Sequence, residues 1–236
     1  MRYRENESLK ETMTLQTEDT GKVFEMAICL AYGIKYDGKY KYSMQDAEKL
    51  KQRLIKLHTL FPMCKHTAKR GSRYDFTAVE DETSHLSAKT TKKGVGKVAP
   101  QVVGQCQPNL FCKIIDIEYK GVSDLKRLIQ EQPTRILDVL VEYTFDCPNL
   151  FYNKEKDTIR YITLNSRINW DRFNFIWTCN PEKWNNSSTL KIVIDGKEIP
   201  LVEFQFHTKS RTNMAIRWYY ENFLSIFKEN LNVIDL

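Results

Sequence analysis

Polar and apolar residues alternate along two stretches, 74–79 and 85–90, that flank a polar turn in the first half of the chain. A period of two residues is typical of half-buried β-strands, so the pattern predicts a hairpin. If the strands pair symmetrically about Glu82, Asp75 lies opposite Lys89, and directly opposed residues project to the same face of a sheet. The same face then carries two opposed hydroxyl side chains, Thr77 and Ser87. The hairpin is therefore expected to present a polar patch with a carboxylate and an ammonium group.

Helical periodicity precedes the hairpin. One helix is expected over residues 20–33, capped by Thr20 or Asp19 and carrying Glu25 in its middle. A second helix is expected to begin at Ser43. Its apolar face consists of four positions at helical spacing, Ala47, Leu50, Leu54 and Leu57.

The segment that follows the hairpin is basic and contains glycine, and a proline comes after it. Pro100 is expected to start a helix, because its missing N–H costs nothing at that position. Gln101 and Gln105 would then lie one turn apart on one helix face. A further helix is expected over residues 122–130, while residues 136–145 fit either a strand or a helix.

The last third of the chain contains several strand patterns. Residues 158–164 alternate, and the stretches 190–194 and 201–206 flank Asp195-Gly196, a strong hairpin-turn signal. Residues 214–220 are expected to return as a strand and to lead into an amphipathic helix. This order of elements predicts an α/β or α+β fold with a central mixed β-sheet flanked by helices.

Composition adds limits to this picture. A chain of 236 residues with 42% hydrophobic and 12% aromatic residues suits one folded domain and excludes a disordered protein. No apolar run approaches the ~20 residues that cross a bilayer, and the charged N-terminus lacks the apolar part of a signal peptide, so a cytoplasmic protein without a membrane partner is expected. Six dispersed cysteines without a CxxC pair predict reduced, mostly buried thiols. His58, Cys64 and His66 lack the ligand spacing of a structural zinc site.

The net charge of +6 fits an anionic partner without demanding one. Its distribution says more, because basic side chains gather around the hairpin: Lys65, Lys69, Arg70 and Arg73 before it, and Lys89, Lys92, Lys93 and Lys97 within or after it. Such residues suit a polyphosphate substrate, although each lysine taken singly also fits a solvated loop. A carboxylate for a divalent metal, beside a lysine that positions water, favours phosphodiester hydrolysis.

These features, in this order, resemble the PD-(D/E)XK nucleases and, among them, the small Type II restriction endonucleases. The family pattern of a helix glutamate, a strand aspartate and an acidic-x-Lys triplet matches Glu25, Asp75 and Ser87-Ala88-Lys89. The resemblance covers about residues 20–106. It implies a restriction-endonuclease-like core in a single nuclease domain, residues 1–236, whose part from about 134 to 236 completes the sheet and reads DNA.

The resemblance also implies a cofactor and roles for individual residues. Mg²⁺, for which Mn²⁺ can substitute, would be held by Asp75 and the carbonyl of Ala88. Lys89 would orient the attacking water, and hydrolysis would leave a 5′-phosphate.

Ser87 is a catalytic candidate that departs from the family pattern, because an acidic residue usually stands there and a hydroxyl is a poorer Mg²⁺ ligand than a carboxylate. Glu25 is the expected replacement ligand, since Glu80 and Glu82 lie too far along the hairpin. A water-mediated contact and an inactive chain are the alternatives.

DNA contacts are expected from two segments. The first follows the hairpin and contains Thr90, Thr91, Lys92, Lys93, Lys97, Gln101 and Gln105. The second is the strand–loop–strand segment of residues 206–217, with His207, Lys209, Ser210, Arg211, Asn213 and Arg217. Arg, Asn and Gln supply the paired donors and acceptors that base edges require, although a phosphate contact or a solvated loop fits each residue as well. Trp170, Trp177, Trp184 and Trp218 are expected to be core or interface aromatics.

The leading hypothesis is a Mg²⁺-dependent, sequence-specific double-stranded DNA endonuclease, a Type II site-specific deoxyribonuclease or restriction enzyme. A homodimer is expected, because two-fold protein symmetry matches a palindromic site, and a cognate DNA methyltransferase is the expected genetic partner. The alternatives are a DNA repair nuclease and a catalytically impaired nuclease-fold DNA-binding protein. The sequence lacks a P-loop, a Rossmann fingerprint and a nucleophile elbow, which argues against a metabolic enzyme.

Overall fold

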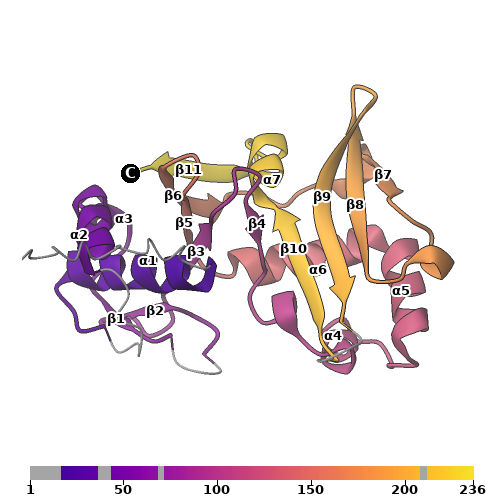
Figure 1. Cartoon of the computed structure of the whole chain (residues 1–236), viewed down its shortest axis with the longest axis horizontal. Coiled ribbons are helices and arrows are strands. Elements are labelled where there is room, and N and C mark those ends of the chain that lie inside the picture. Colours follow the sequence, from indigo (N-terminus) through magenta and orange to yellow (C-terminus); the bar gives the residue numbers. More distant parts are fainter. Residues whose placement is uncertain (1–16, 37–43, 69–71, 208–211) are drawn as a thin grey trace, which may run out of the picture.

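Two β-sheets and their covering helices make up the computed structural model, which describes residues 17–36, 44–68, 72–207 and 212–236 (Figure 1). The first sheet has the order β1 (Cys64–His66), β2 (Phe76–Ala78), β3 (His85–Thr91), β5 (Asn149–Asn153), β6 (Thr158–Leu164) and β11 (Leu231–Asp235). It is mixed, because β3 and β5 run parallel while the other neighbours are antiparallel. The predicted α+β class with a central mixed sheet is confirmed.

The second sheet is antiparallel throughout. Its order is β4 (Lys97–Val98), β10 (Met214–Tyr219), β9 (Lys197–Phe206), β8 (Ser187–Ile194) and β7 (Asn174–Trp177). Asp195 and Gly196 both have positive φ, 50° and 73°, in the tight turn between β8 and β9. Two left-handed residues are what a type I′ turn requires, so the predicted hairpin is confirmed.

The first three helices of the chain cover one face of the first sheet. They are α1 (Thr17–Tyr32), α2 (Met44–Arg53) and α3 (Leu57–Leu60). The four apolar positions predicted for the second helix are all buried. Because α1 begins at Thr17, Thr20 lies inside the helix and the predicted cap is wrong by about one turn. Ser43, the other expected cap, lies outside the described residues.

The first sheet is buried on both faces, and β5 shows this most clearly. Leu150 and Tyr152 belong to the core that contains α1 and α2. Phe151, between them, belongs to a second core built from α4 (Pro108–Ile114), α5 (Val122–Glu131), α6 (Pro133–Phe145), α7 (Tyr220–Ile226) and the second sheet. Alternate residues of a strand point to opposite faces, and a strand with a parallel neighbour is commonly covered on both.

The register of the β2–β3 hairpin differs from the predicted one. Phe76 pairs with Leu86 and Thr77 pairs with His85, so the pairing centres on Asp81 and not on Glu82. Continued in this register, Asp75 lies opposite Ser87, two residues before Lys89. A shift by two residues keeps every side chain on its face, whereas a shift by one would reverse it. The predicted polar patch is therefore present although the predicted register was wrong.

The helix predicted from Pro100 is wrong. Val102 has a φ of 58°, which a right-handed helix excludes, and only a short 3₁₀ turn, Val103–Gln105, follows. The backbone N–H of Gln101 instead donates to Tyr143 in α6. Gln101 is buried and Gln105 is exposed, so the two amides do not share an accessible face.

Several other expectations can be compared directly. Residues 136–145, which fitted either element, are helical in α6, and the strand expected over 158–164 matches β6. The strand β10 leads into α7 as predicted, and the helix expected over residues 122–130 is α5, which ends at Glu131. All six cysteines are free and five are buried, and Trp170, Trp184 and Trp218 are core residues. Within the described ranges, no helix combines the length and apolarity needed to cross a membrane.

Candidate active site

Asp75 stands just before β2 with one of its two carboxylate oxygens anchored. Oδ2 accepts a hydrogen bond from Ser87 Oγ at 3.0 Å and a second from the Ala88 backbone N–H at 2.8 Å. No described residue donates to Oδ1. The hairpin thus fixes the carboxylate through one oxygen and leaves the other available to a ligand.

Lys89 lies on the same face of the first sheet as Ser87, because β3 alternates and Leu86 and Ala88 pack against the core under α1. Its ammonium group makes no hydrogen bond, and no ion pair within 4.0 Å, with the described residues. Burial lowers the pKa of Lys89, while the nearby charge of Asp75 opposes this shift. Burial also raises the pKa of Asp75; the charge of Lys89 opposes this shift and the charge of Glu25 adds to it. Both groups are thereby shifted towards neutrality, as functional residues often are.

The backbone of Ala88 adds an oxygen to this arrangement. The N–H and C=O of one strand residue point to the same side, and the Ala88 N–H points to Asp75. The paired part of β2 ends before this position, since its ladder with β3 stops at Phe76 and Leu86. The Ala88 carbonyl is therefore directed towards the aspartate and not into a ladder with β2.

A magnesium ion suits this oxygen set better than a metal that needs a complete protein cage. Mg²⁺ usually retains several waters and binds through one or two carboxylates together with substrate phosphates. In the parts of the chain that the structure describes, no group of three or more His, Cys, Asp and Glu could hold a metal ion. Asp75 Oδ1 and the Ala88 carbonyl are the oxygens that fit such an ion.

Glu25, the expected replacement ligand, lies on the other face of the sheet. Its Oε1 accepts from Lys22 Nζ at 2.8 Å, and its Oε2 lies 2.9 Å from the same Nζ and 3.2 Å from His66 Nε2. His66 pairs with Phe76, whose side chain belongs to the core under α1. Both oxygens of Glu25 are thus already engaged, yet its charge raises the pKa of Asp75, so Glu25 lies within electrostatic reach of that carboxylate. Its role as a metal ligand stays a prediction.

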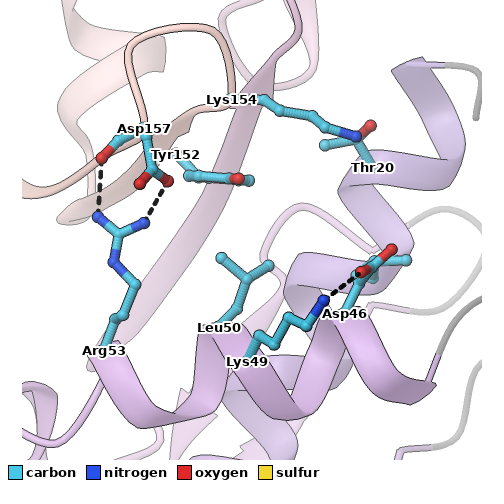
Figure 2. A pocket seen from close by; sticks show the side chains of 9 residues that line it. Thr20, Asp46, Lys49, Leu50, Arg53, Tyr152, Lys154 and Asp157 are labelled. Carbon is cyan, nitrogen blue, oxygen red and sulfur yellow. Dashed lines mark hydrogen bonds and ion pairs between the residues drawn. The ribbon is translucent and has the colours of Figure 1, made fainter.

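The helix-covered face also contains a hollow lined by α1, α2 and β5 (Figure 2). Arg53 clamps Asp157 there, with 2.5 Å from Nη1 to Oδ1 and 2.8 Å from Nη2 to the backbone oxygen. Lys49 lies 4.0 Å from Asp46, and Figure 2 marks this contact with a dashed line between the two side chains. These charges neutralise one another in pairs.

Asp146 is a second carboxylate near Lys89 that the sequence did not identify. Its Oδ2 lies 2.7 Å from Arg73 Nη2 and accepts from the Tyr74 hydroxyl at 2.9 Å. Its Oδ1 lies 3.3 Å from Gln101 Nε2, and its charge raises the pKa of Lys89. Asp146 could have been found from its place just before β5, because parallel neighbouring strands such as β3 and β5 begin at the same edge of a sheet.

The basic loop after β3 lies at the opposite end of the strand from Asp75. Thr91 accepts from the Lys154 N–H in the β5–β6 turn, and the Gly94 N–H donates to Glu155 at 2.9 Å. Four residues separate Ser87 from Thr91, or about 13 Å of strand. Lys92 and Lys93 therefore do not adjoin the Asp75 carboxylate.

The remaining DNA-contact candidates occupy different surroundings. Thr90 faces α1, and Thr91 is buried and bonded to Lys93. Lys97 and Arg217 both contact Glu203, at 2.8 Å and 3.3 Å. His207 and Asn213 lie at the base of the β9–β10 loop, joined by a backbone hydrogen bond of 2.9 Å. Lys209, Ser210 and Arg211 lie outside the described residues.

A comparison with known proteins found one similar protein. The chain is similar to a Type II restriction enzyme. That protein, the Type II restriction enzyme CviAII of Paramecium bursaria Chlorella virus 1, is 38% identical over 225 residues, which cover 94% of this chain and 64% of the relative. The chain thus spans a little less than two thirds of the relative's length. No protein-family model and no solved structure matches the chain.

Proposed function

We propose that the protein is a Mg²⁺-dependent, site-specific DNA endonuclease of the Type II restriction class. One observation carries the proposal: Asp75 keeps a free Oδ1 on the same face as the unpaired, partly buried ammonium of Lys89. The 38% identity to a Type II restriction enzyme supports the same reaction.

Each of the hairpin residues would have its own role in the reaction. Asp75 Oδ1 and the Ala88 carbonyl would hold Mg²⁺, which polarises the scissile phosphate and lowers the pKa of a bound water. Lys89 would orient that water; burial lowers the pKa of its ammonium group, and the charge of Asp75 opposes this shift. Ser87 would act on Asp75, whose Oδ2 it bonds, and not on the metal. The products would carry 5′-phosphate ends.

Partners follow from the same proposal. Double-stranded DNA is the substrate, and a homodimer would match the two-fold symmetry of a palindromic site. A cognate methyltransferase would protect the host's own copies of that site.

Digestion of a mixed-sequence plasmid with Mg²⁺ tests the proposal. Discrete bands are expected from the protein, and their number should match the occurrences of one short sequence. A smear would indicate a nonspecific or repair nuclease, and intact plasmid bound in a gel-shift assay would indicate a DNA-binding protein without catalysis.

The site assignment needs its own variants. Asp75→Ala and Lys89→Ala should each abolish the bands and keep most DNA binding, while chelation of Mg²⁺ should abolish the bands from the unaltered protein. If either variant cut DNA normally, the substituted residue would not be part of the catalytic site.

A further inference from the structure

Gln101 is a buried polar residue that the proposed mechanism does not use. It is 5% exposed, although it follows the basic loop after β3. Its amide nitrogen Nε2 donates to Asp146 Oδ1 and to Cys147 Sγ, at 3.3 Å in each case. The polar contacts of Gln101 are therefore made inside the protein and not at a surface that DNA could reach.

These two contacts bring the Gln101 amide into the surroundings of Lys89. The groups whose charges act on the Lys89 ammonium are Asp75, Cys147 and Asp146, and Gln101 contacts two of these three. Asp75 precedes β2, while Asp146 and Cys147 precede β5, and β3 with Lys89 lies between these two strands. The ammonium group thus has Asp75 on one side and Asp146 with Gln101 on the other.

Asp146 differs from Asp75 because the protein holds both of its carboxylate oxygens. Arg73 and the Tyr74 hydroxyl contact Oδ2, at 2.7 Å and 2.9 Å, and Gln101 donates to Oδ1. The Asp146 side chain is only 12% exposed, so water and salt screen its charge little. A carboxylate held in this way is not free to bind a cation, but it offers Lys89 a fixed negative charge.

Gln101 and Lys89 each lack what the other can supply. Gln101 Oε1 is buried and accepts no hydrogen bond from a described residue. The Lys89 ammonium is a donor, and it has no acceptor within hydrogen-bond distance among the described residues. A buried acceptor without a donor is unfavourable and requires an explanation. A shift of the Lys89 side chain towards Gln101 would satisfy both groups.

The backbone at Gln101 is strained in a way that fixes its position. Val102 has a φ of 58° and a ψ of −61°, and the Val103 N–H donates to the Gln101 carbonyl, as in a γ-turn with positive φ. Val102 is β-branched and 44% exposed, so the packing of its own side chain does not explain this rare conformation. The Gln101 N–H donates to the Tyr143 carbonyl at 2.9 Å. Such strain is found where the surrounding structure holds a functional residue in place.

We propose that Gln101 and Asp146 position Lys89 for cleavage, with Gln101 Oε1 as the acceptor that holds the ammonium group when DNA is bound. The inference rests on the proposed endonuclease function. It makes Gln101 a positioning residue that acts through Lys89 and not on the substrate. Loss of the Gln101 amide should therefore slow the chemical step and leave DNA affinity unchanged.

Single-turnover cleavage at saturating DNA, measured beside DNA affinity, tests this role. Gln101→Met removes the amide at similar side-chain length and should lower the cleavage rate by about 10- to 100-fold, the factor that one hydrogen bond to a charged group contributes. Gln130→Met is the matched control and should cut at the original rate, because Gln130 Nε2 donates at 2.8 Å to the Cys179 carbonyl, away from Lys89.

Two outcomes of this measurement would overturn the proposal. Weaker DNA affinity with an unchanged rate at saturation would make Gln101 a DNA contact. Equal rate losses in Gln101→Met and Gln130→Met would make the role of Gln101 structural. If the unaltered protein cut no DNA, the endonuclease function itself would fail, whereas normal cutting by Gln101→Met in an active protein would overturn only the role of Gln101.

A double-variant cycle tests whether Gln101 acts through Lys89. In the Lys89→Ala background, Gln101→Met should cause no further loss of rate, because the group that it positions is absent. Losses that multiply would overturn the proposal. Asp146→Asn keeps the shape of the side chain and removes its charge, so it should also slow cleavage, and it provides the test if Gln101→Met does not fold. An unchanged rate in Asp146→Asn would overturn the proposal as well.

Discussion

The two faces of the first sheet each carry a buried acid beside a lysine, and they differ in how completely the charges are satisfied. On the helix-covered face, Glu25 uses both oxygens on Lys22 and His66. On the opposite face, Asp75 uses only Oδ2, and Lys89 has no partner within ion-pair distance among the described residues. A satisfied buried pair stabilises a fold, whereas an unsatisfied one keeps groups free for a ligand.

The difference arises from local geometry and not from residue type. Lys22 lies one turn before Glu25 on α1, a spacing that brings the two side chains together. Asp75 and Lys89 come from different segments, and the backbone N–H of Ala88 takes the oxygen that a cation would otherwise occupy. The hairpin thus holds the acid in place without neutralising it.

The largest expected effect separates the two lysines. Lys89→Ala should lower the rate of DNA cleavage by about 10²–10⁴-fold, the range of one positioned acid–base group. Lys22→Ala, which removes a similar charge from the other face, should leave the rate within about threefold, because the active-site contacts stay intact. Single-turnover cleavage rates measure both. Equal losses of cleavage rate in the two variants would show that the two lysines do not differ in function.

Much of the fold follows from local sequence signals. The strand alternation over residues 158–164 and the Asp195-Gly196 turn identify β6 and the β8–β9 hairpin, because period and turn chemistry are properties of short segments. The hairpin register was not predictable in the same way. Asp81 Oδ1 accepts from the backbone N–H and the hydroxyl of Thr83, and this side-chain turn moves the centre of pairing to Asp81.

The candidate site was only partly predictable, for a related reason. Asp75 and Lys89 lie in one hairpin, so strand periodicity alone puts them on one face. Asp146 is distant in sequence and reaches the site because β5 pairs with β3 in parallel, after three intervening helices. Glu25 has a family-like position on its helix, and helical spacing predicts its contact with Lys22, but its contact with His66 becomes visible only once β1 is placed.

A second prediction concerns Glu25 itself. Glu25→Gln should lower the free energy of unfolding by about 1–3 kcal/mol, because it removes the charge that His66 and Lys22 face in a buried setting. Cleavage by the folded variant should stay near the original rate. Urea unfolding together with a cleavage assay separates the two effects. Unchanged stability combined with lost cleavage would instead make Glu25 part of the catalytic site.

A third prediction tests the anchoring of Asp75. Ser87→Ala should slow cleavage by up to about tenfold, which corresponds to the loss of one hydrogen bond of about 0.5–1.5 kcal/mol. The Ala88 N–H still holds the same oxygen, so activity should not disappear. Ser84→Ala, in the turn of the same hairpin, is the matched control and should cut normally. Complete inactivity of Ser87→Ala would give the serine a role at the metal.

The smallest expected effect comes from Glu221, an acid in the first turn of α7 that contacts Asn153 at the far end of β5. Glu221 is bonded by Asn153 at 2.8 Å, by Lys156 at 2.9 Å, and by Arg160. Burial alone would raise the pKa of Glu221, but these hydrogen bonds and the charge of Arg160 lower it below the ordinary 4.5. A lowered native pKa contributes stability above the unfolded value, and that stability is lost as the pH falls through the native value.

Glu221→Gln should therefore lower the melting temperature near neutral pH by about 2–4 °C, the shift that 1 kcal/mol produces in a chain of this size. The difference from the unaltered protein should shrink below pH 4.5, where the unfolded carboxyl takes up its proton. Calorimetry across this range measures the difference, with cleavage at neutral pH as the control. If Glu221→Gln cut DNA poorly while keeping its melting temperature, Glu221 would be a functional residue. The number of hydrogen-bond and ion-pair partners of an acid would then no longer distinguish structural acids from functional ones around this sheet.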